Sequence, residues 1–169
     1  MITQTFTEFG SDLKIGKIGE RIFIEDFLEF LDFSYINVTD MQGFRIMDGD
    51  ILTKFGLYEI KANYKDDCKL VIEEYSNINT NYSSLSKGWF YTSKADVFVF
   101  VSKKTRSMII LPATKLLRSH YEKIKTYYSL IYNKPTRHNG YIWQSAFRRI
   151  PLIALDGYFA IYQKNRKLL

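Results

Sequence analysis

The chain has 169 residues, of which 46% are hydrophobic, and its formal net charge is +6. This length and apolar content suffice for one domain with a buried core and exclude an intrinsically disordered chain. No apolar run approaches the ~20 residues of a membrane-spanning helix, and the N-terminal residues lack the layout of a signal peptide. We therefore expect a single domain over residues 1–169 that is cytoplasmic and has no membrane partner.

The charge is distributed unevenly along the chain. Residues 1–102 contain 10 Lys and Arg against 16 Asp and Glu, a balance of −6, whereas residues 103–169 contain 14 against 2, a balance of +12. A strongly basic half predicts attraction to a polyanion, most commonly a nucleic acid. A lysine-rich surface that is merely solvated is the alternative.

Residues 10–31 predict an N-terminal helix that begins near Ser11 or Asp12. Gly16 and Gly19 are expected to permit close packing of this helix on a sheet. Glu20 falls within the apolar arc of the helix, where a glutamate that forms only a surface ion pair is not expected. At ~100° per residue, the arc consists of Ile15, Gly19, Ile22, Phe23, Phe27 and Phe30.

Short segments rich in β-branched and aromatic residues follow this helix, with polar or glycine-containing turns between them. They predict a meander of four strands over residues 34–40, 44–52, 57–63 and 69–75. Residues 96–102 form an almost continuous apolar run, as expected for a strand covered on both faces. Residues 107–112 should be its hairpin partner, joined to it through residues 103–106.

The last third of the chain predicts one helix and then extended segments. Residues 113–133 have the spacing of a long amphipathic helix that ends before Pro135. Residues 140–163 read as mostly extended, with a turn at Asp156-Gly157. Trp89 and Trp143 are expected in the core, although such rings can also stack on unpaired bases. The element order predicts an α/β (α+β) protein with a mixed sheet and helices packed against it.

Acidic side chains gather on two neighbouring predicted strands. Glu59 and Lys61 share one strand face because side chains alternate along a strand, and Ile60 points into the opposite layer. Asp48 and Asp50 lie on the preceding strand, and the turn between the strands brings the two together. Carboxylates with waters and phosphate oxygens suit Mg²⁺, and a lysine can orient water or neutralise developing charge.

Asp50, a gap of eight residues and then Glu59-Ile60-Lys61 resemble the signature of the PD-(D/E)xK nucleases, which have the restriction-endonuclease-like fold. The resemblance covers roughly residues 12–118. It implies a mixed central sheet flanked by helices. Glu20 matches an acid on the first helix of many members, Glu73 matches a further acid in phage and plasmid members, and residues 88–101 resemble the stretch that opens a buried strand in those members.

The resemblance implies a site but leaves two choices open. Asp48 competes with Asp50 for the first ligand position, and Asp50 is preferred because its spacing is nearer to the usual one. Glu73 and Glu74 point to opposite strand faces, so only one of them can serve, and the pattern favours Glu73. The implied metal ligands, for Mg²⁺ or Mn²⁺, are Asp50, Glu59, the Ile60 carbonyl and Glu73. The implied catalytic residues are Asp50, Glu59, Lys61 and Glu20.

By this resemblance we expect a metal-dependent DNA endonuclease, phage- or plasmid-encoded, that resolves Holliday junctions or other branched DNA as a homodimer. A homing or restriction-type endonuclease is the alternative within the family. A nucleic-acid-binding module without turnover is the alternative from another class. Arg148 and Arg149 are the first candidates for phosphate contacts, and because they are adjacent in a predicted strand only one should touch DNA. The further candidates are Lys103, Lys104 and Arg106.

Overall fold

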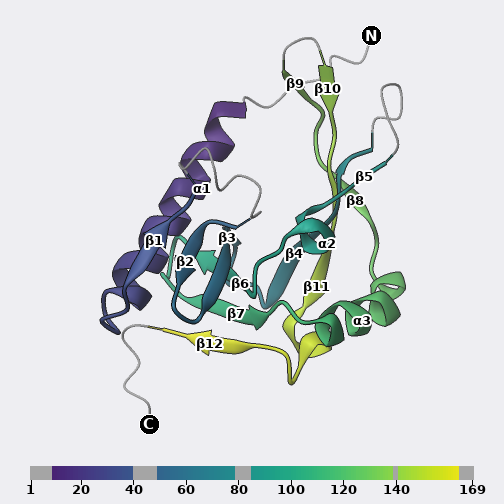
Figure 1. The fold of residues 1–169 in the computed structure, drawn as a ribbon. Coiled ribbons are helices and arrows are strands. Elements are labelled where there is room, and N and C mark those ends of the chain that lie inside the picture. Colours follow the sequence, from purple (N-terminus) through teal and green to yellow (C-terminus); the bar gives the residue numbers. More distant parts are fainter. Residues whose placement is uncertain (1–8, 40–48, 79–84, 139–140, 164–169) are drawn as a thin grey trace.

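The computed structural model describes residues 9–39, 49–78, 85–138 and 141–163 (Figure 1). The N-terminal helix α1 (Phe9–Phe23) continues directly into the π-helix η1 (Ile24–Leu28). Ile22 and Phe23 are buried, as the apolar arc predicts.

The prediction that Phe30 lies on the buried side is wrong, because this side chain is exposed. The hydrogen bonds from Glu29 N to Ile24 O (2.9 Å) and from Phe33 N to Leu28 O (2.8 Å) span five residues rather than four. A π-turn of this kind adds a residue to the turn and shifts the helical wheel relative to 100° spacing. Leu28 is therefore buried where the regular wheel would bury Phe30.

The larger sheet, which we call sheet A, has six strands in the order β1-β2-β3-β6-β7-β12. Only β3 and β6 run parallel, and the other neighbours are antiparallel, so the sheet is mixed. The predicted hairpin around residues 103–106 is confirmed as β6–β7. The bounds of the strands are β1 Tyr35–Asn37, β2 Ile51–Thr53, β3 Gly56–Tyr64, β6 Val97–Ser102, β7 Met108–Pro112 and β12 Ala160–Tyr162.

The fourth strand of the predicted meander leaves sheet A. Strand β4 (Lys69–Asn77) belongs to sheet B, an antiparallel sheet in the order β5-β4-β11-β8. The prediction fails because β6, which is apolar on both faces, takes the place beside β3, and β4 pairs instead with a strand from the far end of the chain. The other strands are β5 Ser86–Lys87, β8 Ile131–Tyr132 and β11 Ala146–Pro151, with a separate pair of β9 Thr136–His138 and β10 Tyr141–Trp143.

The predicted long helix over residues 113–133 is shorter than expected. Helix α3 spans Lys115–Ile124, the 3₁₀ turn η3 follows at Lys125–Tyr127, and the chain then enters β8. Thr114 begins the helix, because its hydroxyl accepts a hydrogen bond from Leu117 N at 3.1 Å. The helix ends early because the aromatic and β-branched residues after it favour a strand, and β8 finds a partner in β11.

The C-terminal segment is extended, as predicted, except for the 3₁₀ turn η4 (Leu152–Leu155). Gly157 adopts φ +80°, a left-handed conformation that suits glycine, and so confirms the turn at Asp156-Gly157. No helix in the described part of the chain is long and apolar enough to cross a membrane.

Two hydrophobic clusters cover the two faces of sheet A. One contains Ile22 and Phe23 of α1 with Ile60 of β3 and Val99 of β6. The other lies between sheet A, sheet B and α3 and includes Phe98, Phe100, Leu70, Ile72, Leu117 and Tyr121. Strand β6 is thus covered on both sides, as its apolar run predicts. The molecule is an α+β protein with two sheets, an N-terminal helix and a second helix against them (Figure 1).

The two tryptophans differ in their surroundings. Trp89 begins the short helix α2 (Trp89–Thr92) and packs against the cluster between the sheets, in ring contact with Phe98 and Phe100. Trp143 lies at the end of β10 and is 46% exposed, so its predicted place in the core is wrong. The β9–β10 pair is separate from sheet B, and Trp143 belongs to neither hydrophobic cluster of the described residues.

Candidate functional site

Strand β3 presents Glu59 and Lys61 on one face, where their side chains form a hydrogen-bonded ion pair. Ile60 points the other way and is buried with the side chains of α1. The alternation predicted for this strand is therefore observed. Both members of the ion pair are largely covered by protein, so their charges lie in surroundings less polar than water.

Asp50 precedes β2 and reaches across to β3. Its Oδ2 accepts a hydrogen bond from Ile60 N at 2.6 Å, just beyond the last regular pair, Ile51 with Tyr58. The carboxylate thus continues the ladder with a side-chain oxygen in place of a backbone one. Because the N–H and carbonyl of a strand residue face the same neighbour, the Ile60 carbonyl faces the Asp50 side.

Burial and the charge of Glu59 raise the pKa of Asp50 to about 7, and the charge of Glu20 adds a smaller increase. Lys61 and the hydrogen bond from Ile60 N act in the opposite direction without cancelling the increase. Two carboxylates that repel each other in a covered site are stabilised when a cation binds between them. The electrostatics of this edge therefore suit a positively charged ligand.

We expect Asp50→Asn to raise the free energy of unfolding above pH 7 by about 4 kcal/mol in EDTA. The folded protein holds the Asp50 proton from about pH 4 to about pH 7, whereas the unfolded chain releases it near 3.8. The wild type therefore loses stability as pH rises through this window, and the variant lacks that loss. Urea unfolding at pH 4, 6 and 8 measures the difference.

Added Mg²⁺ should then stabilise the wild type at pH 8 and leave Asp50→Asn unchanged, because the cation would relieve the repulsion that the variant has already removed. Identical pH profiles for the two proteins would show that Asp50 ionises like a solvent-exposed aspartate. A Mg²⁺-induced stabilisation of equal size in both would place the cation elsewhere.

Strand β4 supplies a further acid on the same side. Glu73 Oε1 accepts a hydrogen bond from Trp89 N at 3.4 Å, and its pKa is raised chiefly by burial. The charge of Lys61 lowers that pKa and the charge of Glu59 raises it, so the three groups act on one another. Glu74 points to the opposite face, where Tyr121 and Arg148 donate to it at 2.8 Å each. Of the two candidates, Glu73 is the one beside Lys61.

The segment that contains α2 contacts each of these groups, although the sequence did not single it out for this role. The Lys61 Nζ lies 4.9 Å from the centre of the Trp89 ring, at a distance suited to a cation–π contact. Ser93 Oγ donates to Glu59 Oε2 at 3.3 Å. At Gly88 a Cβ atom would lie 2.5 Å from the Glu73 carbonyl oxygen, so only glycine permits this approach.

Helix α1 brings Glu20 to the edge of sheet A. A Cβ on Gly19 would lie 2.5 Å from that of Ala62, so glycine allows the helix to lie directly on β3, whereas Gly16 has open space around it. Glu20 Oε2 accepts from Asn37 Nδ2 at 3.3 Å and from Thr39 Oγ1 at 3.4 Å. Within the candidate set Glu20 acts on Asp50, whose pKa it raises.

The donor set fits a divalent cation of the Mg²⁺ type. Among the described residues, no group of three or more His, Cys, Asp and Glu side chains is arranged to hold a metal ion. Mg²⁺, however, takes only one or two carboxylates and completes its shell with waters and phosphate oxygens. Asp50, Glu59 and the Ile60 carbonyl meet that requirement with oxygen ligands alone. Asp48, the alternative to Asp50, lies outside the described residues.

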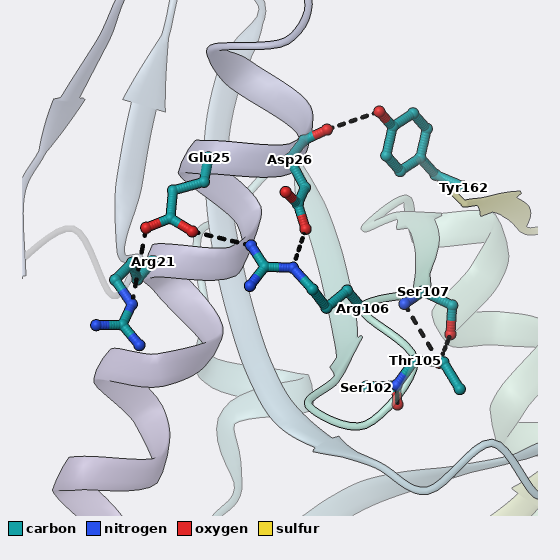
Figure 2. A network of polar contacts seen from close by, with 8 residues as sticks. All are labelled: Arg21, Glu25, Asp26, Ser102, Thr105, Arg106, Ser107 and Tyr162. Carbon is teal, nitrogen blue, oxygen red and sulfur yellow. Dashed lines mark hydrogen bonds and ion pairs between the residues drawn. The ribbon is translucent and has the colours of Figure 1, made fainter. Parts of the chain in front are cut away.

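The candidate phosphate-binding residues lie in the turn between β6 and β7 and on strand β11. Lys103 and Lys104 are exposed in the turn between β6 and β7. Arg106, in the same turn, bonds to Asp26 and, at 2.9 Å, to Glu25 Oε2, and Figure 2 shows its guanidinium between these two acids of η1. Tyr162 adds a hydrogen bond of 2.6 Å to the Asp26 carbonyl. The Arg106 side chain thus ties the turn to η1.

Arg148 and Arg149 also have acidic partners within the chain. Arg148 Nε donates to Glu74 Oε1 at 2.8 Å, and its Nη1 donates to the Tyr128 carbonyl. Arg149 pairs with Asp67 at the surface. A phosphate contact by either residue stays a prediction, and for Arg148 it would compete with the bond to a carboxylate that is 3% exposed.

Comparison of the chain with protein-family models, curated proteins and solved structures gives no match. The family resemblance of the Asp50 and Glu59-Ile60-Lys61 pattern therefore stays a prediction.

Proposed function

We propose that the protein is a Mg²⁺- or Mn²⁺-dependent phosphodiesterase that hydrolyses DNA. One observation carries the proposal: carboxylates from three separate strands or strand ends meet around a single lysine. Asp50, Glu59 and Glu73 interact electrostatically with one another or with Lys61 in a covered site. A purely structural strand face would not need three acids there, because burying like charges costs stability.

The residues divide the work of phosphodiester hydrolysis as follows. Asp50, Glu59 and the Ile60 carbonyl would hold a divalent cation, which supplies Lewis-acid polarisation of the phosphate. Lys61, held by Glu59 and the Trp89 ring, positions the attacking water and offsets the charge that develops on the phosphate oxygens. Glu73 lies beside Lys61, and the charge of Glu20 raises the pKa of Asp50.

The test compares wild type and Lys61→Ala on linear duplex, single-stranded and four-way-junction DNA, each in Mg²⁺ and in EDTA. The proposal expects cleavage by the wild type in Mg²⁺ only, and at least about 100-fold slower cleavage by the variant. A preference for the junction would favour a branched-DNA resolvase acting as a dimer, and a preference for duplex would favour a restriction or homing type. Cleavage in EDTA, or equal rates for the two proteins, would contradict the proposal.

We expect Glu20→Gln to slow cleavage by about 10-fold and to change the free energy of unfolding by less than about 1 kcal/mol. The amide oxygen of glutamine can still accept from Asn37 and Thr39, so the variant loses the charge and keeps the contacts. Steady-state cleavage and urea unfolding measure the two quantities. Wild-type rates in this variant would assign Glu20 to the packing of α1 alone.

A further inference from the structure

Sheet B extends into a region that contains no acidic residue. We define the arm as the described parts of residues 75–87 and 127–147 (75–78, 85–87, 127–138 and 141–147), which include β5, β8, β9, β10 and the paired ends of β4 and β11. These two segments contain no Asp or Glu, and they contain the cationic residues Lys87, Lys134 and Arg137. The β9–β10 pair lies at the end of the molecule opposite β12 (Figure 1).

The arm also exposes large aromatic rings. Tyr127 is 81% exposed, Tyr132 is 57% exposed and Trp143 is 46% exposed, and Ile131, next to Tyr132 in β8, is also exposed. Exposed apolar side chains that gather in one region mark an interaction surface more often than scattered single ones. These exposed rings therefore indicate a surface that binds a partner.

The positive charge of the arm distinguishes among the partners that could cover these exposed rings. A second copy of the arm would bring like charges together, which costs free energy. The phosphates of a DNA duplex would pair with the lysines, but its bases are already stacked on one another and would not stack on the rings. A nucleic-acid strand with unpaired bases satisfies both, because phosphates meet the cations and base faces stack on the rings.

The arm joins the candidate site through the backbone. Strand β5 passes through Gly88 directly into α2, whose Trp89 ring lies over Lys61. In sheet B, Glu73 of β4 pairs with Phe147 of β11 at the base of the arm. A nucleic-acid strand that binds along the arm therefore extends toward the carboxylates of the candidate site.

We infer that the arm binds unpaired bases of a nucleic-acid strand, with Trp143 and Tyr132 as stacking platforms and Lys134 at the phosphates. Binding itself does not depend on the proposed function; the suggestion that the bound strand reaches the cutting site rests on it. The substrate class is DNA that has a single-stranded region beside the bond to be cut.

The test measures binding of a labelled oligo-dT strand and of a duplex of the same length by fluorescence anisotropy in EDTA, over a salt series. Trp143→Ala should weaken binding of the single strand by about 5- to 150-fold and leave the slope of log K against log [salt] unchanged. Trp143→Phe, which keeps a ring, should retain most of the affinity. Lys134→Ala should instead lower the slope by ~0.7 on the single strand.

Phe55→Ala is the matched control, because Phe55 is 56% exposed in the β2–β3 turn, outside the arm. It should bind both nucleic acids as the wild type does. The inference is overturned if Trp143→Ala and Tyr132→Ala both keep wild-type affinity for the single strand, or lose affinity for the duplex equally. It is also overturned if Trp143→Ala changes only the molecular mass in sedimentation, because the arm would then join two copies.

The two proposals can fail separately. If the protein binds the single strand through Trp143 in EDTA but cleaves no DNA in Mg²⁺, the inference about the arm holds and the proposed phosphodiesterase activity is refuted. If Trp143→Ala cleaves duplex DNA at the wild-type rate and keeps its affinity for the single strand, the phosphodiesterase proposal holds and the inference about the arm is refuted.

Discussion

We expect Glu59→Ala to abolish DNA cleavage while leaving DNA binding nearly intact. Glu59 is the carboxylate that pairs with Lys61, receives the Ser93 hydroxyl and contributes to the raised pKa values of both Asp50 and Glu73. Its removal takes away a proposed ligand and releases Lys61. Loss of residues that only orient metal ligands typically costs 10–100-fold, so a direct ligand should cost at least about 100-fold in cleavage rate.

Glu59→Gln is the control for shape, since it keeps a similar volume and an oxygen that can accept from Ser93. It should be inactive as well if negative charge is what the site requires. Binding is measured in Ca²⁺, an oxygen-liganded divalent cation like Mg²⁺. Cleavage by Glu59→Ala at the wild-type rate would refute the site, and activity in Glu59→Gln alone would mean that geometry rather than charge is what Glu59 provides.

The second large effect concerns stability rather than catalysis. Arg148→Ala should lower the free energy of unfolding by about 3–5 kcal/mol, because it leaves a buried carboxylate without its charged partner. Glu74 is almost fully buried between β4, β11 and α3, with only Arg148 and Tyr121 donating to its Oε1 among the contacts that the structure describes. Equilibrium unfolding in urea measures the loss.

Arg149→Ala is the matched control on the neighbouring residue. Its partner Asp67 is exposed, so the loss should be within about 0–1 kcal/mol. The double variant Glu74→Leu with Arg148→Met should recover most of the stability that Arg148→Ala loses, since an apolar pair can replace a buried ion pair. A loss below about 1 kcal/mol in Arg148→Ala would show that water reaches Glu74. The salt dependence of DNA binding in the same variants tests the predicted phosphate contacts.

The part of the site that the sequence could predict is the part governed by local periodicity. A spacing of two residues in a strand sets Glu59 and Lys61 on one face, and the opposite faces of Glu73 and Glu74 follow from the same rule. The helical wheel correctly turned Glu20 inward, because Gly19 and Ile22 lie on the same arc and pack on β3. These placements need no knowledge of the partner strands.

What the sequence could not predict depends on pairings between distant segments. The Arg148–Glu74 ion pair joins residues 74 positions apart and exists only because β11 pairs with β4. The contact of Trp89 with Lys61 likewise needs α2 to lie over β3. Neither periodicity nor composition specifies which edge a strand chooses, so the sequence predicts neither the pairing of β4 with β11 nor the exposure of Trp143.

The parallel pairing of β3 with β6 sets the order in which the protein can assemble. Antiparallel neighbours can form as soon as a short turn closes, but a parallel partner must wait for a crossover, here residues 65–96. That crossover contains β4, whose other edge is filled only by β11, near the end of the chain. During synthesis, Asp50 and Glu59 can meet early, whereas β4 keeps an open edge until β11, residues 146–151, has emerged. We therefore expect ribosome-bound chains that stop before residue 146 to be prone to aggregation and slow to mature, because exposed strand edges invite pairing with other chains.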